Sequence, residues 1–553
     1  YPFESFKLYC NTTKTNIAGE GGVFKFTPSE SGEYSFTAEG TDKAGYTDTV
    51  TFTIQAASAY EAEISSKDMA KYLAETPETT LNDTIKAKAD KFNGVVDAYS
   101  YVLNNIAFDA YVNSRRGAIG ADELKRANDV DQASLLIGLC RYMGVPARYE
   151  TGTITLNEKQ AKDLMAMDDF ESACQHINNS GKSVVYNSKA KTAKFDQTRV
   201  QVYVPYSAIG VNDSDKKDLG VWVSLDTSIK ESDLKEYAVT PKSHSEALGK
   251  FDEIYDKYDD TKVKDFVDQT SKTYVQSTKS LQREIVKKDI TVLPKELQYE
   301  TVAETKNFDA ISSSMADTLS ISVDGQWGDT SSLGTYKVSD LYGKRVTLWY
   351  KGSTGSKTVF EMSSSQITYN EFTPVLSIDG KIVAQGDSML LGTKHYMDMT
   401  IKTGGRSEHI NDRLTAGSVY SINLDVGGIS DVDLKKAYNE TNDNVQKSNE
   451  SNYYDEDKIG AYLAFAGKLY FAQCDVNNLI NASTRNVEFG THTKVAVTSY
   501  SVRTEENLYG YTSKIVDGDF QIDVDYNTVY SISRTGDKQA RNDYMFTSAY
   551  TES

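Results

Sequence analysis

The stretch from Asn128 to Ile154, NDVDQASLLIGLCRYMGVPARYETGTI, constrains the fold of this chain more than any other. An apolar run at helical spacing follows its polar start and ends at Arg141. Gly144 and Pro146 then stop the helix, and an alternating strand pattern begins at Arg148. The stretch therefore predicts a helix that leads directly into a strand. The helix face predicted to pack on a sheet consists of Leu135, Leu136, Leu139 and Tyr142.

The spacing inside this stretch resembles the core motif of the transglutaminase-like family. That motif is Cys-x-Asp-x-Ala, followed by spaced leucines, an arginine and the block Gly-Ile-Pro-Ala-Arg. Here Asp131 and Ala133 occupy the Asp and Ala positions, and residues 144–148 reproduce the last block with Val for Ile. The resemblance covers about 85–235 and implies an α+β fold like that of papain-like cysteine proteases. It is closest to a branch found inside large secreted bacterial polyproteins.

The resemblance also implies that the catalytic residues of the family have been replaced. In the family, a cysteine at the helix start is activated by a histidine, which an aspartate orients. The cysteine position holds Asp129, and among the three triad positions only Asp226 keeps its expected type. The strand that should carry His, Trp and Glu holds Gln197, Arg199 and Gln201. The resemblance therefore implies a degenerate triad of Asp129, Gln197 and Asp226, and with it a pseudoenzyme.

Three other arrangements could restore chemistry. Cys140 lies eleven residues beyond Asp129, which is ~16 Å along a helix, so it is interpreted as a core residue. Cys174 and His176 are two positions apart and would not face each other on a helix. Asp129 and Asp226 could form an acid–base pair. The simpler interpretation of Asp129 is a helix N-cap.

Changes of pattern along the chain predict a multidomain protein. Residues 1–57 alternate like strands and resemble the last strands of a bacterial Ig-like domain. The predicted fold class is an Ig-like β domain, then an α+β transglutaminase-like domain, then mostly β, sandwich-like domains with a helical insert. The predicted boundaries are 1–57 for the Ig-like domain, 58–240 for the transglutaminase-like domain, 241–290 for a helical connector, 291–429 for a β-rich domain, 430–483 for a helical segment and 484–553 for a C-terminal β domain.

Several local signals refine these boundaries. Asn82 is a predicted N-cap, and 115–120 is a predicted loop. Asp379-Gly380 predicts a hairpin turn, and a second hairpin is expected within 516–526. The polar run 439–458 predicts a loop. The helix expected after it is indicated by Ile459, Leu463, Ala466 and Tyr470.

Composition narrows the functional class. A net charge of −19 and a pI of about 4.9 argue against a nucleic-acid binder and against attraction to an anionic membrane. No apolar stretch of 18 residues appears, so no membrane span is expected. The chain starts in strand-like sequence without a leader, which favours a piece of a longer precursor. No metal or cofactor is expected, because no ligand spacing involves Cys10, Cys140, Cys174 or Cys474.

These observations together predict a non-catalytic, secreted or cell-wall-associated bacterial binding protein. The expected partner is a protein or glycan outside the cell, as for an adhesin or a binder of host glycoproteins, including immunoglobulins. The 37 tyrosines suit such a surface, although strand propensity alone also accounts for them. A monomer is expected. The alternatives are an active transglutaminase-like amidase or cross-linking enzyme, and a structural spacer of a large surface polyprotein.

Overall fold

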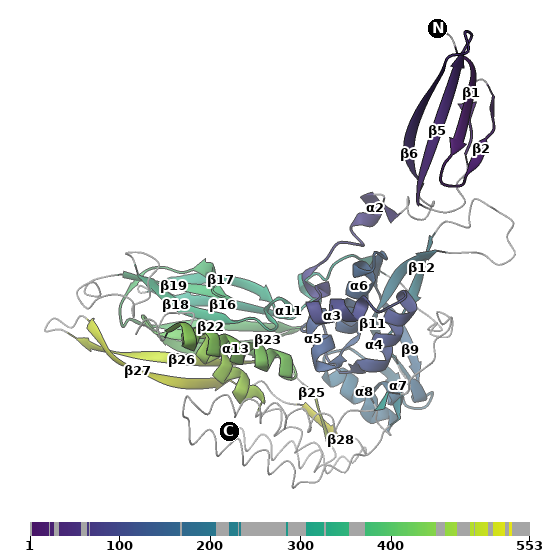
Figure 1. Ribbon diagram of the computed structural model, residues 1–553. Coiled ribbons are helices and arrows are strands. Elements are labelled where there is room, and N and C mark those ends of the chain that lie inside the picture. Colours follow the sequence, from purple (N-terminus) through teal and green to yellow (C-terminus); the bar gives the residue numbers. More distant parts are fainter. Residues whose placement is uncertain are drawn as a thin grey trace. The chain divides into compact units, whose positions relative to one another are not determined.

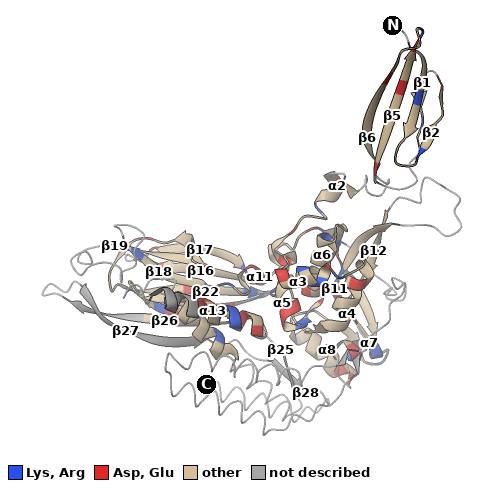
Figure 2. Cartoon of the chain, viewed as in Figure 1, with Lys and Arg blue, Asp and Glu red and all other residues tan. Residues whose placement is uncertain are grey.

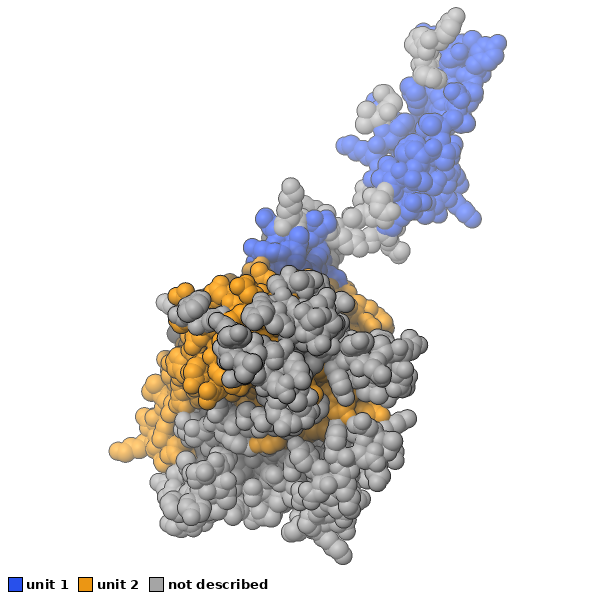
Figure 3. Space-filling view, turned by 90° about the vertical axis from the view of Figure 1, so that its left-hand side faces the viewer, with its two compact units in different colours: residues 1–74, 144–147, 201–223 blue, residues 75–143, 148–200, 224–553 orange. Residues whose placement is uncertain are grey.

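Figure 1 shows the computed structural model of the chain. It divides into two compact units, which Figure 3 distinguishes by colour. Unit 1 comprises residues 1–74, 144–147 and 201–223, and unit 2 comprises 75–143, 148–200 and 224–553. The structure describes residues 3–20, 23–26, 32–56, 64–65, 67–165, 169–205, 220–229, 232–233, 284–285, 306–325, 328–352, 371–448, 459–472, 487–490, 493–506, 512–525 and 530–533.

The N-terminal part of unit 1 is an antiparallel sheet with the strand order β2-β1-β5-β6. Its alternating sequence gives one apolar face, whose core contains Cys10, Tyr34 and Phe36. The strands predicted within 1–57 are thus present, whereas their Ig-like assignment stays a prediction. The strands of this region are β1 (Phe3–Cys10), β2 (Thr15–Ile17), β3 (Gly19–Glu20), β4 (Val23–Phe24), β5 (Gly32–Asp42) and β6 (Thr47–Ala56).

Helices dominate the first part of unit 2. Asn82 is an N-cap as predicted, since its side chain accepts a hydrogen bond from the Ile85 N–H. The predicted loop 115–120 is wrong in its second half, because a helix begins at Gly117. The helices are η1 (Pro77–Thr79), α3 (Asp83–Ala89), α4 (Val95–Asn105), α5 (Gly117–Leu124), α6 (Asp129–Tyr142), α7 (Glu158–Met165) and α8 (Phe170–Asn179), while α2 (Lys67–Ala70) lies in unit 1.

Helix α6 is central to this region and is buried on all sides from Asp129 to Arg141. The predicted packing face is correct for its three leucines, which are fully buried, but Tyr142 is 44% exposed. Its hydroxyl donates to Asp90 at the surface, so the ring leaves the core. Gly144, with φ of +78°, ends the helix as predicted.

The sheet beside α6 has the order β10-β11-β9-β15, with β12 next to β11. Strand β15 comes from far along the chain, and Phe308 in it pairs with Tyr149 of β9. The strands are β9 (Ala147–Asn157), β10 (Val185–Asn187), β11 (Thr192–Pro205), β12 (Gly220–Leu225) and β15 (Lys306–Phe308), and a separate parallel pair joins β7 (Ala107–Phe108) to β8 (Arg126–Ala127).

Two antiparallel sheets share one apolar core in the rest of unit 2, including Leu319, Met397, Leu376 and Ile422. The first has the order β17-β16-β22-β23 and the second β20-β19-β18-β24-β26-β27, with β21 beside β19. The strands are β16 (Thr318–Asp324), β17 (Thr330–Lys337), β18 (Val346–Gly352), β19 (Glu371–Ile378), β20 (Lys381–Gln385), β21 (Met389–Leu390), β22 (Lys394–Thr403), β23 (Arg406–Thr415), β24 (Val419–Asp425), β26 (Lys494–Glu506) and β27 (Thr512–Asp525), and the short helices are η3 (Ser313–Met315) and α11 (Val338–Leu341).

The structure joins segments that the predicted boundaries separate. Strand β26, from the predicted C-terminal domain 484–553, pairs with β24 of the predicted domain 291–429. The predicted helical segment 430–483 contains α13 (Asp431–Ser448) and a helix at 459–472. The predicted loop 439–458 is therefore wrong over its first ten residues. The hairpin expected within 516–526 is also wrong, since 512–525 is one strand.

The remaining local predictions have mixed outcomes. Asp379 and Gly380 both have positive φ and connect β19 to β20 as the predicted hairpin turn. The predicted connector 241–290 lies outside the described residues except for β14 (Glu284–Ile285), which pairs with β13 (Ser232–Asp233). A further two-stranded pair joins β25 (Val487–Gly490) to β28 (Tyr530–Ser533). Among the described helices, none has both the length and the apolar character needed to cross a bilayer.

Candidate functional site

The candidate site lies at the first turn of α6. Asn128, and not Asp129, is the N-cap: its side chain accepts a 2.9 Å hydrogen bond from the Asp131 N–H. Asp129 is the first helical residue, where the helix dipole favours a carboxylate. It is only 2% exposed, and its Oδ2 accepts a 2.7 Å hydrogen bond from the Thr198 N–H of β11. The position that the motif reserves for a thiol thus holds a buried carboxylate.

Lys182 is the charge partner of that carboxylate. Its Nζ lies 2.6 Å from Asp129 Oδ1, and its side chain is 9% exposed. The same ammonium donates to Gln197 Oε1 at 3.0 Å and to the Asp196 carbonyl at 3.4 Å. An ammonium has three donors, so these contacts engage all of them. Lys182 lies in the turn after α8 and belongs to no motif, which is why sequence patterns did not point to it.

Gln197 extends the network to the third triad position. Its Nε2 donates to Ser228 Oγ, and Ser228 Oγ donates to Asp226 Oδ1 at 2.6 Å. The Asp226 carbonyl accepts a 2.9 Å hydrogen bond from Tyr99 on α4. The structure therefore links the three predicted positions through two residues that the sequence did not indicate, Lys182 and Ser228. We call Asp129, Lys182, Gln197, Ser228 and Asp226 the Asp129 network, and each of these side chains is at most 9% exposed.

Two carboxylates on the first turn of α6 have different roles. Asp131 is fully buried and accepts five hydrogen bonds, which are all with the preceding loop. Two come from hydroxyls and three from consecutive backbone N–H groups, an arrangement that holds an anion well. The donors are Tyr111 Oη at 2.8 Å, Ser114 Oγ at 2.6 Å, and the N–H groups of Arg115, Arg116 and Gly117 at 3.1, 2.9 and 3.0 Å. Asp131 therefore fixes loop 111–117 against α6.

That loop is in turn held by the two-sheet region of the same unit. Arg115 Nε lies 3.0 Å from Asp317 Oδ2, with both side chains at most 1% exposed. Arg116 donates to the Val426 carbonyl at 2.9 Å and to Asp109 at 2.7 Å. These contacts hold loop 111–117 between α6 and the two-sheet region.

Val112, in the same loop, lies between the network and the two-sheet region. A Cβ placed on Gly181, the residue before Lys182, would lie 3.1 Å from Val112 Cγ2. A Cβ on Gly404, in the turn between β22 and β23, would lie 3.2 Å from the same atom. Both backbones thus pack closely against this one side chain. The hairpin turn at Gly404 therefore packs on the loop that precedes α6.

Two of the described thiols, Cys140 and Cys174, are poor candidates for a nucleophile. Cys10, Cys140 and Cys174 are free and buried. Burial raises the pKa of the Cys140 thiol to about 12 and that of the Cys174 thiol to about 11. Cysteine chemistry needs the thiolate, which such pKa values suppress at neutral pH. Cys174 packs in an apolar core with Phe170 and Ile177.

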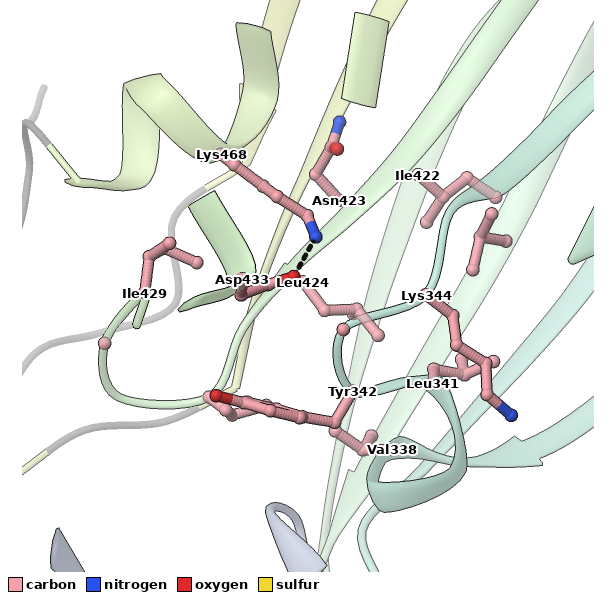
Figure 4. A pocket seen from close by; sticks show the side chains of 14 residues that line it. Val338, Leu341, Tyr342, Lys344, Ile422, Asn423, Leu424, Ile429, Asp433 and Lys468 are labelled. Atoms are coloured by element: carbon pink, nitrogen blue, oxygen red, sulfur yellow. Dashed lines mark hydrogen bonds and ion pairs between the residues drawn. The ribbon is translucent and has the colours of Figure 1, made fainter. Parts of the chain in front are cut away.

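A small cavity elsewhere in unit 2 is not an alternative site. Its volume is about 20 Å³, which is room for one water molecule. Figure 4 shows its polar wall, where Asp433 Oδ1 lies 2.5 Å from Lys468 Nζ. Among the described residues, no group of three or more His, Cys, Asp or Glu side chains is arranged to hold a metal ion. The Asp129 network is thus the site that the sequence and the structure both single out.

The fold and the site together define an α+β domain in which the first turn of a buried helix meets an antiparallel sheet. The family model of the transglutaminase-like superfamily matches residues 78–227. These residues form a transglutaminase-like domain, as the motif predicted.

Similar solved structures are distant. One is a putative cysteine protease from Cytophaga hutchinsonii, 14% identical, with 41% of this chain and 66% of that chain covered and a TM-score of 0.19. The match thus spans slightly less than two thirds of that protein. Another is red sea bream transglutaminase, 10% identical, with 76% and 81% covered and a TM-score of 0.21. A search of curated proteins gave no match.

Proposed function

We propose that the transglutaminase-like domain is a non-catalytic scaffold within a bacterial binding protein that acts outside the cell. The observation that supports this most directly is the ion pair of Asp129 and Lys182. It occupies the position where the family motif has its nucleophile, and it uses the lysine's donors for internal contacts. A carboxylate whose two oxygens are already engaged by an ammonium and a backbone N–H is poorly placed to attack a substrate.

The proposed partner is a protein or glycan on a host or neighbouring cell, such as a host glycoprotein or an immunoglobulin. The tyrosine-rich, acidic composition supports extracellular binding of this kind. The corresponding location is the secreted fraction or the cell wall. The test is capture from serum, mucus and cell-wall extracts with the intact chain as bait. A saturable partner supports the proposal, and no partner from any source favours a structural spacer.

The test against catalysis uses thiol labelling and amine transfer. The intact chain is incubated at pH 8 with an iodoacetamide probe, and separately with an amine donor and a glutamine substrate. We expect Cys140 and Cys174 to stay unlabelled in the native chain and to label fully in urea, because burial keeps both thiols neutral. Labelling of one native cysteine, together with amine incorporation that the label abolishes, would establish an active enzyme instead.

A further inference from the structure

A fully buried pair of opposite charges joins β24 to β26. Asp425 is the last residue of β24, Lys494 is the first of β26, and the two are direct partners in the register of these strands. The Lys494 Nζ lies 3.0 Å from Asp425 Oδ2, and the two side chains are 4% and 0% exposed. Figure 2 shows strands β16 and β18 of the same region mostly in tan, with one charged residue each. Burying two ions in such a region costs free energy, so this pair calls for an explanation.

The second oxygen of the Asp425 carboxyl is held by backbone donors. Asp425 Oδ1 accepts hydrogen bonds from the N–H groups of Gly427 at 2.8 Å and Gly428 at 2.7 Å. Both glycines have positive φ, +101° and +140°, a backbone conformation that lets successive N–H groups point at one atom. Arg116 holds this turn in place, because its guanidinium donates to the Val426 carbonyl at 2.9 Å. One carboxyl oxygen thus has the surroundings of an oxyanion hole, while the lysine nitrogen lies next to the other.

The other buried lysine–carboxylate pairs in the described part of the chain lack this arrangement. The Asp129 carboxylate accepts from one backbone N–H, that of Thr198. Glu78 Oε2 has no hydrogen-bond partner among the described atoms. The Asp433 carboxylate accepts from Lys468 and from no described backbone N–H. Two converging backbone donors therefore set the Asp425 carboxyl apart from the carboxyls of these pairs.

We propose that Lys494 and Asp425 react with each other to form an intramolecular amide bond between β24 and β26. The lysine nitrogen has to reach Cγ, which is one bond of ~1.2 Å from Oδ2. Two groups held this close in a fixed orientation react as if at effective concentrations of about 10⁵–10⁸ M. Fixed N–H donors for the charge that develops on Oδ1 contribute a further factor of about 10²–10³. The amide replaces two buried charges by a neutral group, which removes the cost of keeping ions out of water.

The reaction needs no reagent from outside and releases one water molecule. Burial raises the pKa of Asp425, but Lys494 and the two glycine N–H groups outweigh burial and hold this pKa below its usual value, so the pair starts ionised. One proton passes from the ammonium to Oδ2, and the neutral amine then attacks Cγ to form the C–N bond. Oδ1 carries the negative charge of the tetrahedral intermediate. A second proton moves from nitrogen to Oδ2, the Cγ–Oδ2 bond breaks, water leaves, and Oδ1 becomes the amide carbonyl oxygen.

The first test is the mass of the intact, denatured chain, followed by peptide mapping. We expect a mass that is lower than the sequence mass by one water molecule, and a branched peptide that joins the segments around Asp425 and Lys494. Lys494→Arg should restore the full mass, because a guanidinium keeps the charge of the pair but stays protonated and does not attack a carboxyl. The matched control is Lys468→Arg, at another buried ion pair, in which the mass deficit should persist. A wild-type chain of full mass, or a deficit that survives Lys494→Arg, overturns the proposal.

The second test is thermal denaturation, which reports the constraint that the bond places on the unfolded chain. An amide between Asp425 and Lys494 closes a loop of roughly 70 residues, so the unfolded state has less conformational freedom. We expect the wild-type chain to melt about 5–15 °C above Lys494→Arg, and a reducing agent to leave this difference unchanged. Equal melting temperatures of the wild-type chain and Lys494→Arg would show that no bond links these strands.

Discussion

The N-terminal sheet and the region around α6 distribute their polar and apolar residues in opposite ways. Strand β6 leaves Val50 and Ile54 more than half exposed. Around α6 the reverse holds: Asp129, Asp131 and Gln197 are at most 2% exposed. Contact of apolar groups with water is unfavourable, so covering them stabilises the protein. Buried charges, in contrast, need fixed internal partners. The comparison indicates that the N-terminal sheet leaves apolar side chains open to solvent, whereas the region around α6 keeps its polar side chains inside.

The contrast makes Asp131 the most sensitive residue of the α6 region. We expect Asp131→Ala to destabilise the domain by about 3–5 kcal/mol, because three backbone N–H groups and two hydroxyls would lose their buried acceptor. Urea denaturation measures this. Asp163→Ala is the control: that carboxylate pairs with a 70% exposed Lys159 and should cost below about 0.5 kcal/mol. Similar losses for both would contradict the assigned role.

The ion pair of Asp129 and Lys182 should behave as a coupled unit. We expect Lys182→Met to cost about 3 kcal/mol, since it leaves the Asp129 carboxylate buried without its cation. Adding Asp129→Asn to that variant should recover at least about 1 kcal/mol in urea denaturation. If the two losses simply add, the residues are independent and the ion pair is not what holds the site together.

Tight packing of α6 predicts a smaller effect at Gly138. A Cβ there would lie 2.5 Å from the Thr79 carbonyl oxygen and 2.9 Å from Leu81 Cδ2. We therefore expect Gly138→Ala to lower the free energy of unfolding, measured by urea denaturation, by about 1–3 kcal/mol. Gly405→Ala is the matched control, because a Cβ at Gly405 has no neighbour within 4 Å. A neutral Gly138→Ala would show that α6 can shift away from η1.

The smallest effect is expected on the exposed strand. Val50→Ser should change the stability of the dilute chain by less than about 0.5 kcal/mol, because the side chain is already 60% in contact with water. Val200→Ser, in β11 and 1% exposed, should cost several times more. Thermal denaturation at low protein concentration separates this effect from any association. A large loss at Val50 would mean that β6 is covered within its own chain.

The sequence predicted elements whose signals are local, and it missed contacts between residues that are far apart along the chain. The α6–β9 block carries its own signals, a capped apolar run followed by Gly and Pro, so the helix, its end and the strand were predictable. Lys182 was not, because a lone lysine in a turn acquires its role only when the fold brings Asp129 beside it. Strand β15 pairs with β9 and strand β26 with β24, and both partners are far away in sequence. Local sequence patterns do not predict such pairing.

Helix α13 shows a different limit. Its second half, rich in Asn and Asp, has the composition of a loop, and intrinsic propensity disfavours a helix there. The structure continues the helix to Ser448. Thr441 is 5% exposed and donates to the Ala461 carbonyl of helix 459–472. Tertiary contacts here outweigh local preference, which a single sequence does not reveal.

Strand β15 has a consequence for which fragments of this protein can keep their structure. A fragment ending at residue 227 would encode the whole family match, yet its sheet would lack the strand whose Phe308 ring stacks on Tyr149 at 5.2 Å. Glu78, fully buried, would lose the ammonium of Lys337. The folded unit around α6 thus extends beyond the residues that the family model matches, and a protein cut at residue 227 would lose both contacts.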